Sequence, residues 1–220
     1  MGLIYKHRHL IDARYRMSED HRTMRSDDRA GDRIATDGGA ADVEQPSVQN
    51  PEATLVSLGA LEEAPSGDLR LTGEFESAWD DAIADVKADG DANREELVSV
   101  MGIDSDGDVQ LEPVDDAFRI MIDGNLVGAL ESEAAFYADL AGGRLLSDRH
   151  DEWHDLPVAD RSRLLKGLRL FLETCPECGN DVLFDTKEVE SCCGSHQVAA
   201  VDCDECGSRL FESAPIDQDL

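Results

Sequence analysis

The chain has 220 residues, a length that fits one ordinary domain or two small ones and excludes large multidomain enzymes and barrels of about 250 residues. Apolar residues make up 41% of the chain, which is enough for most of it to fold around a core. The chain has 49 acidic and 20 basic residues, so its formal net charge is -29 and its surface must be strongly negative.

The first 52 residues are polar, and their charge differs from that of the rest. Residues 1–25 hold six Lys and Arg residues against three acids, a net charge of +3. One interpretation is a basic arm that binds nucleic acid. The favoured one is that translation starts at Met17 or Met24, which leaves the first 16–23 residues outside the protein. Residues 1–52 are expected to be disordered, because so polar a segment buries too little apolar surface to offset the conformational entropy lost on ordering.

Residues 53–156 are predicted to form a small α+β domain in which helices flank a three-stranded meander. Apolar side chains recur at three- and four-residue spacing around Trp79, which predicts an amphipathic helix with this indole facing a core. The dipeptide Asp123-Gly124 is a two-residue hairpin signal between the last two strands. The predicted helices cover residues 74–88, 93–101 and 133–141, and the predicted strands cover residues 109–112, 117–122 and 125–130.

Glycine and proline set the expected limits of the later helices. Gly142 and Gly143 are expected to stop the helix over residues 133–141. A connecting amphipathic helix over residues 157–173 follows, with Pro157 in its first turn. This helix carries the one basic cluster of the chain, Arg161, Arg163, Lys166 and Arg169. Nucleic-acid contact is one interpretation of the cluster. The favoured one is that long basic stems flank an apolar stripe and pair with carboxylates.

All six cysteines lie between residues 175 and 206. The sequences CPECG over residues 175–179 and CDECG over residues 203–207 both read C-x2-C-G, and two such turns supply the four thiolates of a tetrahedral zinc site. The glycine after each pair allows a backbone conformation in which nearby amides donate to sulfur.

The segment between the two turns is predicted to be a β-hairpin with strands over residues 181–190 and 196–202. Because one strand leaves the first turn and the other returns to the second, both turns meet at the open end of the hairpin. Cys192, Cys193 and His196 would then lie at the far tip, about 25 Å away.

Residues 174–212 resemble the zinc ribbon family, which is known from transcription factors, RNA polymerase subunits and small adaptor modules. Both C-x2-C-G turns, the hairpin and the trailing sequence Arg-Leu-Phe-Glu over residues 209–212 follow that pattern. The resemblance implies a closed, structural Zn2+ site that stabilises a module too small for an adequate core. The ligands that it implies are Cys175, Cys178, Cys203 and Cys206. The chain is also similar to haloarchaeal proteins that end in such a ribbon, and this similarity implies no activity.

Other interpretations of the cysteines stay open. A rival ligand set of Cys175, Cys178, Cys193 and His196 would leave the second C-x2-C-G turn without a metal. The six cysteines could instead be free or randomly paired, or one C-x2-C could be a redox motif, although no thioredoxin-like βαβ pattern precedes it. Cys192, Cys193 and His196 could form a redox or second metal site at the tip, or simply pack at a turn.

Two further motifs are weak. His150 and His154 stand four residues apart, but Asp151 replaces the glutamate of a zinc-protease motif, so a solvated helix-entry segment is favoured. Asp104-Ser-Asp106-Gly-Asp108 suggests a calcium loop, yet the required glycine and glutamate are absent at its sixth and twelfth positions. We therefore expect an acidic turn there, and we predict no catalytic or cofactor-binding residues.

The composition also bears on the compartment. The chain uses Asp more than Glu (30 to 19) and Arg more than Lys (16 to 4). This preference is typical of proteins from extreme halophiles. In molar salt, where screening acts within about 3 Å, net charge says little about partners. No apolar stretch approaches the roughly 20 residues of a membrane helix, and the N-terminus lacks the apolar core of a secretory signal. We expect a cytoplasmic protein with no membrane contact.

The expected function is that of a non-enzymatic zinc-binding protein. Residues 173–212 carry Lys187 and Arg209 against ten acids, a net charge of -8 that disfavours contact with a phosphate backbone. The ribbon is expected to present a surface to a protein partner, in transcription if the resemblance holds, ahead of an acidic tail over residues 213–220. The alternative is a nucleic-acid-binding regulator that uses the helix over residues 161–169. An enzyme in the middle domain is a third hypothesis, for which the sequence offers no catalytic triad, acid pair or cofactor loop.

Overall fold

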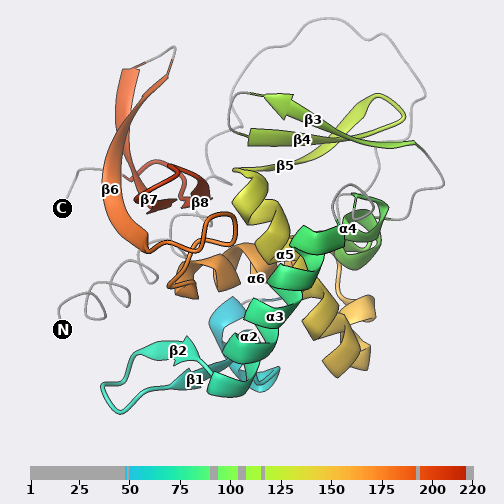
Figure 1. Ribbon diagram of the computed structural model, residues 1–220, viewed down its shortest axis with the longest axis vertical. Helices are drawn as coiled ribbons and strands as arrows, with labels where there is room; N and C mark the ends of the chain where they lie inside the picture. Colours follow the sequence, from blue (N-terminus) through green and yellow to red (C-terminus); the bar gives the residue numbers. More distant parts are fainter. Residues whose placement is uncertain are drawn as a thin grey trace, which may run out of the picture.

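The computed structural model describes residues 48, 50–89, 94–103, 108–114, 117–191 and 194–216. The fold is α+β, with helices packed beside three small antiparallel sheets (Figure 1). The α-helices are α2 (Pro51–Ser57), α3 (Gly73–Asp89), α4 (Arg94–Met101), α5 (Glu133–Arg149) and α6 (Val158–Leu168). The sheets are β1 (Leu61–Glu63) with β2 (Leu69–Leu71), β3 (Val109–Val114) with β4 (Ala117–Ile122) and β5 (Asn125–Leu130), and β6 (Val182–Ser191) with β7 (Gly194–Cys203) and β8 (Arg209–Glu212).

The fold begins earlier in the chain than the polar run predicts. Asn50 caps α2 by accepting a hydrogen bond from the amide of Ala53 at 3.0 Å, and Pro51 takes the first helical position. Residues 50–52, expected to be disordered, are therefore ordered. The β1–β2 hairpin was not predicted either, because three-residue strands carry too little alternation to be recognised. The disorder expected for residues 1–47 lies outside the described residues.

The β-meander is confirmed. Strands β4 and β5 have the predicted limits. Strand β3 continues two residues beyond the predicted end at residue 112, past Pro113 to Val114. Proline is tolerated there because β3 is an edge strand of the order β3-β4-β5. Asp123 and Gly124 form the two-residue turn with φ of 50° and 77°, the left-handed values that a type I′ turn requires.

Helix α5 corrects the prediction that Gly142 and Gly143 stop a helix, because it continues through both to Arg149. A Cβ at Gly142 would lie 3.3 Å from the indole nitrogen of Trp79, and one at Gly143 would lie 1.9 Å from Cγ1 of Val100. The two glycines therefore serve close helix packing, and tertiary contact overrides their low helix propensity. The Trp79 indole also donates to the Ala138 carbonyl at 3.0 Å.

Gly143→Ala is expected to lower the free energy of unfolding by about 1–3 kcal/mol, because the added methyl group must displace Val100 in a packed core. Urea unfolding followed by tryptophan fluorescence measures this change. Gly73→Ala is the matched control, since Gly73 begins α3 and a Cβ there meets no atom within 4 Å. Equal stabilities of the two variants would contradict the packing role of Gly143.

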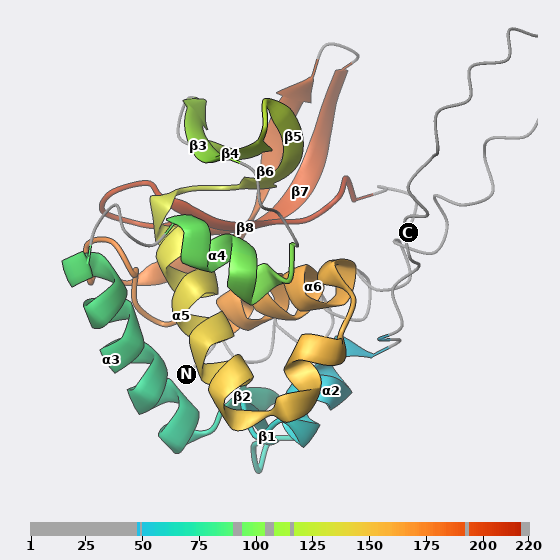
Figure 2. The same cartoon turned by 90° about the vertical axis from the view of Figure 1, so that its right-hand side faces the viewer.

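Helix α5 lies at the centre of the helical layer, with α3, α4 and α6 packed around it (Figure 2). The chain's two tryptophans, Trp79 and Trp153, are both buried in this layer. The predicted helix over residues 157–173 is shorter than expected: α6 ends at Leu168, a 3-10 turn η3 covers Arg169–Phe171, and Leu172 is extended. This turn redirects the chain into the last sheet. Among the described residues, no helix is long and apolar enough to cross a membrane.

Four charged side chains, which we call the Arg169 cluster, lie between the helical layer and the last sheet. They are Glu131, Asp139, Lys166 and Arg169. The Arg169 Nη1 donates to Glu131 Oε2 at 2.7 Å, and its Nε lies 3.0 Å from Asp139 Oδ1. Lys166 Nζ lies 2.8 Å from Glu131 Oε1. Burial raises the pKa of Asp139 to about 6, although the Arg169 guanidinium opposes the shift. The pKa of Glu131 is lowered, because Arg169 and Lys166 outweigh its burial.

The stability contribution of Asp139 is expected to rise as the pH falls from 7 to 5. Its folded-state pKa of about 6 lies above the ordinary 3.8, so between these values the native state binds a proton that the unfolded chain does not. The free energy of unfolding of the wild type, relative to Asp139→Asn, should therefore increase by about 1–2 kcal/mol over this range. Urea titrations of both proteins at pH 5, 6 and 7 test this. A difference that does not change with pH would contradict the shift.

The last sheet has the strand order β6-β7-β8, and its long β6–β7 hairpin projects from the body of the protein (Figure 1). The register pairs Val182 with Cys203 at the open end and Ser191 with Gly194 near the tip. The expected acidic tail begins along this sheet, since the amide of Ile216 donates to the carbonyl of Gln197 at 2.7 Å. Residues 217–220 lie outside the described residues.

Candidate metal centre

Two turns of the same geometry hold the four cysteines. In the first, the amide of Cys175 donates to the carbonyl of Asn180 at 2.7 Å, and the amide of Gly179 donates to the carbonyl of Cys175 at 2.8 Å. In the second, the amide of Cys203 donates to the carbonyl of Ser208 at 3.0 Å, and that of Gly207 donates to the carbonyl of Cys203 at 3.1 Å. The glycines have φ of 77° and 76°, the left-handed conformation in which a Cβ would be strained.

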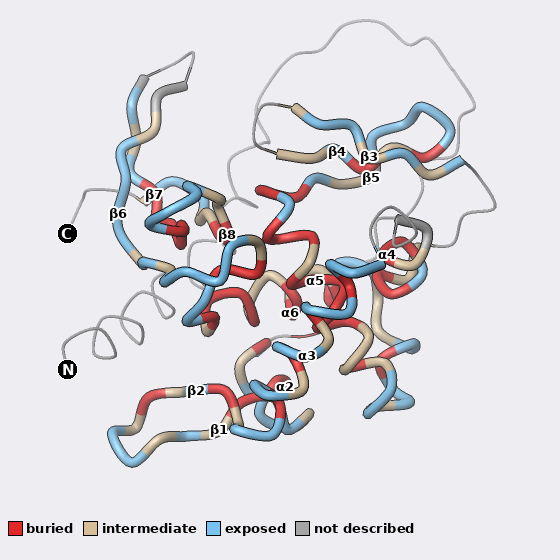
Figure 3. The backbone as a smooth tube through the Cα atoms, in the orientation of Figure 1, coloured by how far each residue is buried: buried red, intermediate tan, exposed pale blue. Residues whose placement is uncertain are grey.

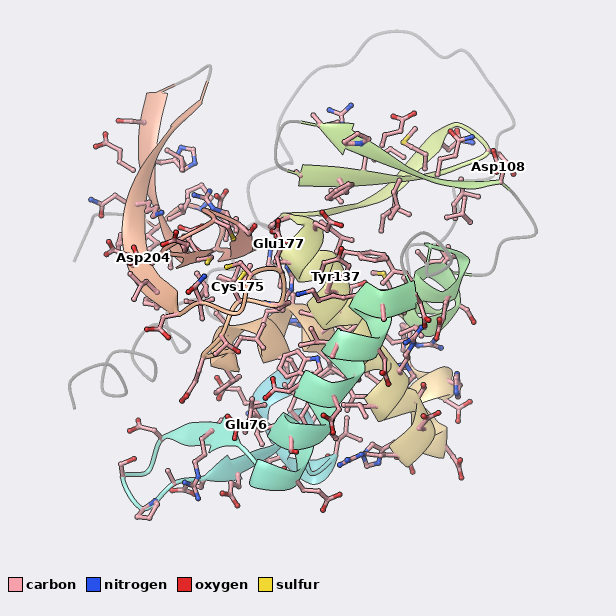
Figure 4. The ribbon with its side chains drawn as sticks, in the orientation of Figure 1. Glu76, Asp108, Tyr137, Cys175, Glu177 and Asp204 are labelled. Atoms are coloured by element: carbon pink, nitrogen blue, oxygen red, sulfur yellow. The ribbon has the colours of Figure 1, made fainter. Side chains whose placement is uncertain are left out.

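The hairpin brings the two turns together as the sequence predicts. The amide of Val182 donates to the carbonyl of Glu173 at 3.1 Å, which fixes the first turn at the start of β6. The amide of Asp204 donates to the carbonyl of Asp181 at 3.3 Å, which links the second turn to the same point. Figure 4 shows Cys175 at the base of the β6–β7 hairpin, between the hairpin and the helices.

The sulfur atoms of Cys175, Cys178, Cys203 and Cys206 all lie within 4.8 Å of one another. The Sγ atoms of Cys175 and Cys206 are 3.7 Å apart, and those of Cys178 and Cys203 are 3.3 Å apart. Four thiolates at a tetrahedral distance of about 2.3 Å from one cation lie about 3.8 Å from each other. The four cysteines are therefore positioned to hold a metal ion.

Amide groups point at the sulfur atoms from within the turns. The backbone amides of Glu177 and Cys178 donate to the sulfur of Cys175, although burial, the larger effect, raises its pKa to about 12. Burial likewise raises the pKa of Cys203. The backbone and side-chain amides of Asn180 lower the pKa of the exposed Cys178 to about 6. A divalent cation would replace the protons of the buried thiols, while the amides stabilise the resulting negative charge.

Three further residues around the turns were not found from the sequence. Ser208 Oγ lies 3.3 Å from the sulfur of Cys206 and contacts the carboxylate of Glu177. Lys87, at the end of α3, donates to the carbonyl of Glu177 at 2.8 Å. The position of Ser208 after Cys206-Gly207 is a signal that could have identified it. Nothing in the sequence indicates the contact of Lys87, because 90 residues separate it from Glu177.

The rival ligand set is not brought together. His196 pairs with Val189 in the β6–β7 ladder, seven residues along β7 from Cys203, which is a distance of about 23 Å. The structure thus separates His196 from Cys175 and Cys178. Cys192 and Cys193 lie outside the described residues, so the interpretations of the hairpin tip stay predictions.

The two weak motifs have structural roles where the chain is described. His150 is extended and follows α5, and His154 lies in a 3-10 turn (Asp151–Asp155), so they do not share a helix face. His150 Nε2 lies 2.6 Å from the carbonyl of Leu58. Residues 104–107 lie outside the described residues, and the amide of Asp108 donates to Asp123 Oδ1 at 3.1 Å across the meander.

The basic cluster of the connecting helix is not a solvated face. Arg161 is buried and donates to the carbonyls of His154, Leu156 and Val100. Arg169 is buried in the Arg169 cluster, and Lys166 lies over the ring of Phe211 at 5.1 Å from its centroid. The interpretation that these side chains pair within the protein is supported, and for Arg161 the partners include three carbonyl groups.

Comparison with known protein families identifies the chain. The sequence model for the central domain of a family of unknown function, DUF8054, matches residues 50–170. The chain belongs to the DUF8054 family. The C-terminal domain model of DUF8054 matches residues 173–213, which include all four clustered cysteines. Neither model names a zinc ribbon. Comparisons with curated proteins and with solved structures found no match. Along the sequence, the boundary between the two DUF8054 domains lies at the end of η3, the turn that begins with Arg169.

Proposed function

We propose that this DUF8054 protein is a non-enzymatic zinc protein, in which a structural site of four cysteines folds the C-terminal domain and presents its outer surface to another protein. The convergence of four sulfur atoms within 4.8 Å is the observation that carries the proposal. A tetrahedral set of four thiolates suits Zn2+, and it leaves no open position for a catalytic water. The zinc therefore has a structural role.

The edge of β6 is the surface that we assign to a partner. β6 pairs with β7 on one side and forms an edge of its sheet, and Figure 3 shows it exposed over most of its length. Leu183 is 44% exposed, and Asp185, Thr186 and Glu188 are exposed on the same strand. An edge strand offers backbone groups to an extended segment of another chain, and the acidic side chains favour a basic segment.

Charge disfavours the alternative of nucleic-acid binding. The two cations of the C-terminal domain, Lys187 and Arg209, both pair with the buried carboxylate of Asp202. In the connecting helix, Arg161 and Arg169 are buried. These side chains are therefore poorly placed to neutralise phosphates. Transcription, the process suggested by the resemblance to zinc ribbons, is the first setting in which to look for a protein partner.

The hypothesis of an enzyme in the middle domain stays a prediction. A hollow of about 80 Å3 beside α3 is lined by Leu71, Trp79, Leu172, Thr174 and the acids Glu76, Asp80 and Glu173. Small-molecule sites usually span about 300–1,000 Å3, so this hollow is too small for most substrates.

The test is capture of a partner from an extract of the native organism on the immobilised chain. A protein retained by the zinc-loaded chain, and lost after treatment with a chelator or in Leu183→Glu, would support the proposed surface. Val56→Glu is the matched control, since Val56 is 41% exposed on α2. A partner that binds equally to all four preparations would contradict the assignment of β6.

A further inference from the structure

We infer that the Arg169 cluster couples metal binding in the C-terminal domain to the stability of the central domain. This inference rests on the proposed zinc site, and it adds a regulatory consequence: loss of the metal weakens a domain that holds none of the ligands.

The first observation is that Arg169 bonds to both domains at once. Its side chain is 3% exposed, and Nη1 donates to Glu131 Oε2 in the central domain and to the Leu210 carbonyl of β8 at 2.6 Å. Its Nε faces Asp139 on α5. Without the carbonyl of Leu210, the guanidinium loses one hydrogen bond, and its ion pairs with Glu131 and Asp139 are opened to water, where they contribute less to stability. The position of β8 therefore affects the energy of α5.

The second observation is that β8 also bonds to the start of α5. Ser132 caps α5 by accepting a hydrogen bond from the amide of Ala135 at 3.1 Å. The same hydroxyl donates to the carbonyl of Arg209 at 2.6 Å. One side chain thus links the first turn of the central helix to the strand that follows the second cysteine turn.

The third observation is that the two domains share one apolar core. Cys175, Cys203, Leu210 and Phe211 belong to the same buried cluster as Trp79. Strand β8 begins two residues after Gly207 of the second cysteine turn, so its position depends on that turn. Without a metal, four thiols have no common bond to hold the turns together, and the C-terminal domain alone is too small for a stable core. Removing the metal therefore withdraws β8 from Arg169 and Ser132.

Tryptophan fluorescence follows the unfolding of the central domain, because the chain's two tryptophans, Trp79 and Trp153, both belong to that domain. The experiment compares urea unfolding of the full chain with zinc bound and after EDTA treatment, in high potassium chloride, with zinc content measured on each sample. For the wild type, we expect EDTA to lower the midpoint of the tryptophan transition by about 0.5–1 M urea.

Two variants locate the coupling. Arg169→Lys keeps a buried cation but loses the forked guanidinium, and Ser132→Gly keeps a tolerated cap but loses the hydroxyl. Both are expected to reduce the EDTA-induced shift to less than half. The matched controls are Arg144→Lys, whose guanidinium pairs with Glu96 inside the central domain, and Asn50→Gly, which removes the capping side chain of α2 and likewise leaves a tolerated cap. Both controls should keep the full shift.

The outcomes separate the two proposals. If the wild type binds zinc but its tryptophan midpoint is the same after EDTA, the coupling is wrong while the zinc site stands. If Arg169→Lys and Ser132→Gly keep the full shift, the assignment to these contacts is wrong. If the wild type binds no zinc, the proposed function and the coupling both fail.

Discussion

Cys203→Ser is expected to abolish zinc retention and to unfold residues 174–212, while the central domain stays folded with reduced stability. Cys203 is buried, and its sulfur lies 3.3 Å from that of Cys178. Structural zinc contributes roughly 10–16 kcal/mol, which becomes folding free energy in a small domain. Loss of one thiolate removes most of that energy, and the shared core then loses Leu210 and Phe211 of β8.

Limited proteolysis and zinc content measure this loss. The C-terminal domain of Cys203→Ser should be cleaved at least tenfold faster than that of the wild type, with the zinc content near zero. Cys192→Ser is the matched control, because it removes a thiol of the same domain that is not among the four clustered cysteines. Wild-type protease resistance in Cys203→Ser, or loss of zinc in Cys192→Ser, would contradict the ligand set.

Arg161→Met is expected to lower the free energy of unfolding by about 3–5 kcal/mol, an effect second only to that of Cys203→Ser. The guanidinium donates to three carbonyl groups, those of Leu156 at 3.0 Å, His154 at 2.5 Å and Val100 at 3.4 Å. Methionine fills a similar volume but leaves the carbonyls of Leu156 and His154 without this donor, while the carbonyl of Val100 keeps the indole of Trp153 at 3.2 Å. The guanidinium also packs against Gly102, where a Cβ would lie 2.2 Å from Nη1.

Urea unfolding followed by tryptophan fluorescence measures the effect of Arg161→Met. Arg70→Met is the control, because Arg70 is 62% exposed and pairs with an exposed Glu62, an interaction worth at most about 1 kcal/mol. If Arg161→Met is as stable as the wild type but loses affinity for a nucleic acid, the side chain serves binding and the structural role is wrong.

The cysteine site was the part of the molecule most accessible to sequence reasoning. The spacing C-x2-C-G encodes a local turn, and two copies at the ends of a hairpin must meet whatever surrounds them. The Asp123-Gly124 turn was predictable for the same reason, since its left-handed conformation depends on adjacent residues alone. In both cases the signal is local and chemical.

The sequence predictions were wrong where contacts between distant parts of the chain determine the local structure. Gly142 and Gly143 look like a helix stop, and only the positions of Trp79 and Val100 show that they are packing sites. Arg169 looks like one member of a basic cluster, and only the placement of β8 shows that it joins two domains. Neither neighbour can be deduced from a helix pattern, because the partners lie far apart in the sequence.

The central claim is that four sulfur atoms hold one zinc ion. The most direct test is the intact mass of the untagged full chain, sprayed from a non-denaturing solution, together with that of Cys203→Ser. The wild type should carry the added mass of one zinc ion less the protons that it displaces, and the variant should have the mass of the polypeptide alone. A wild-type chain that shows only the polypeptide mass after incubation with zinc would contradict the claim.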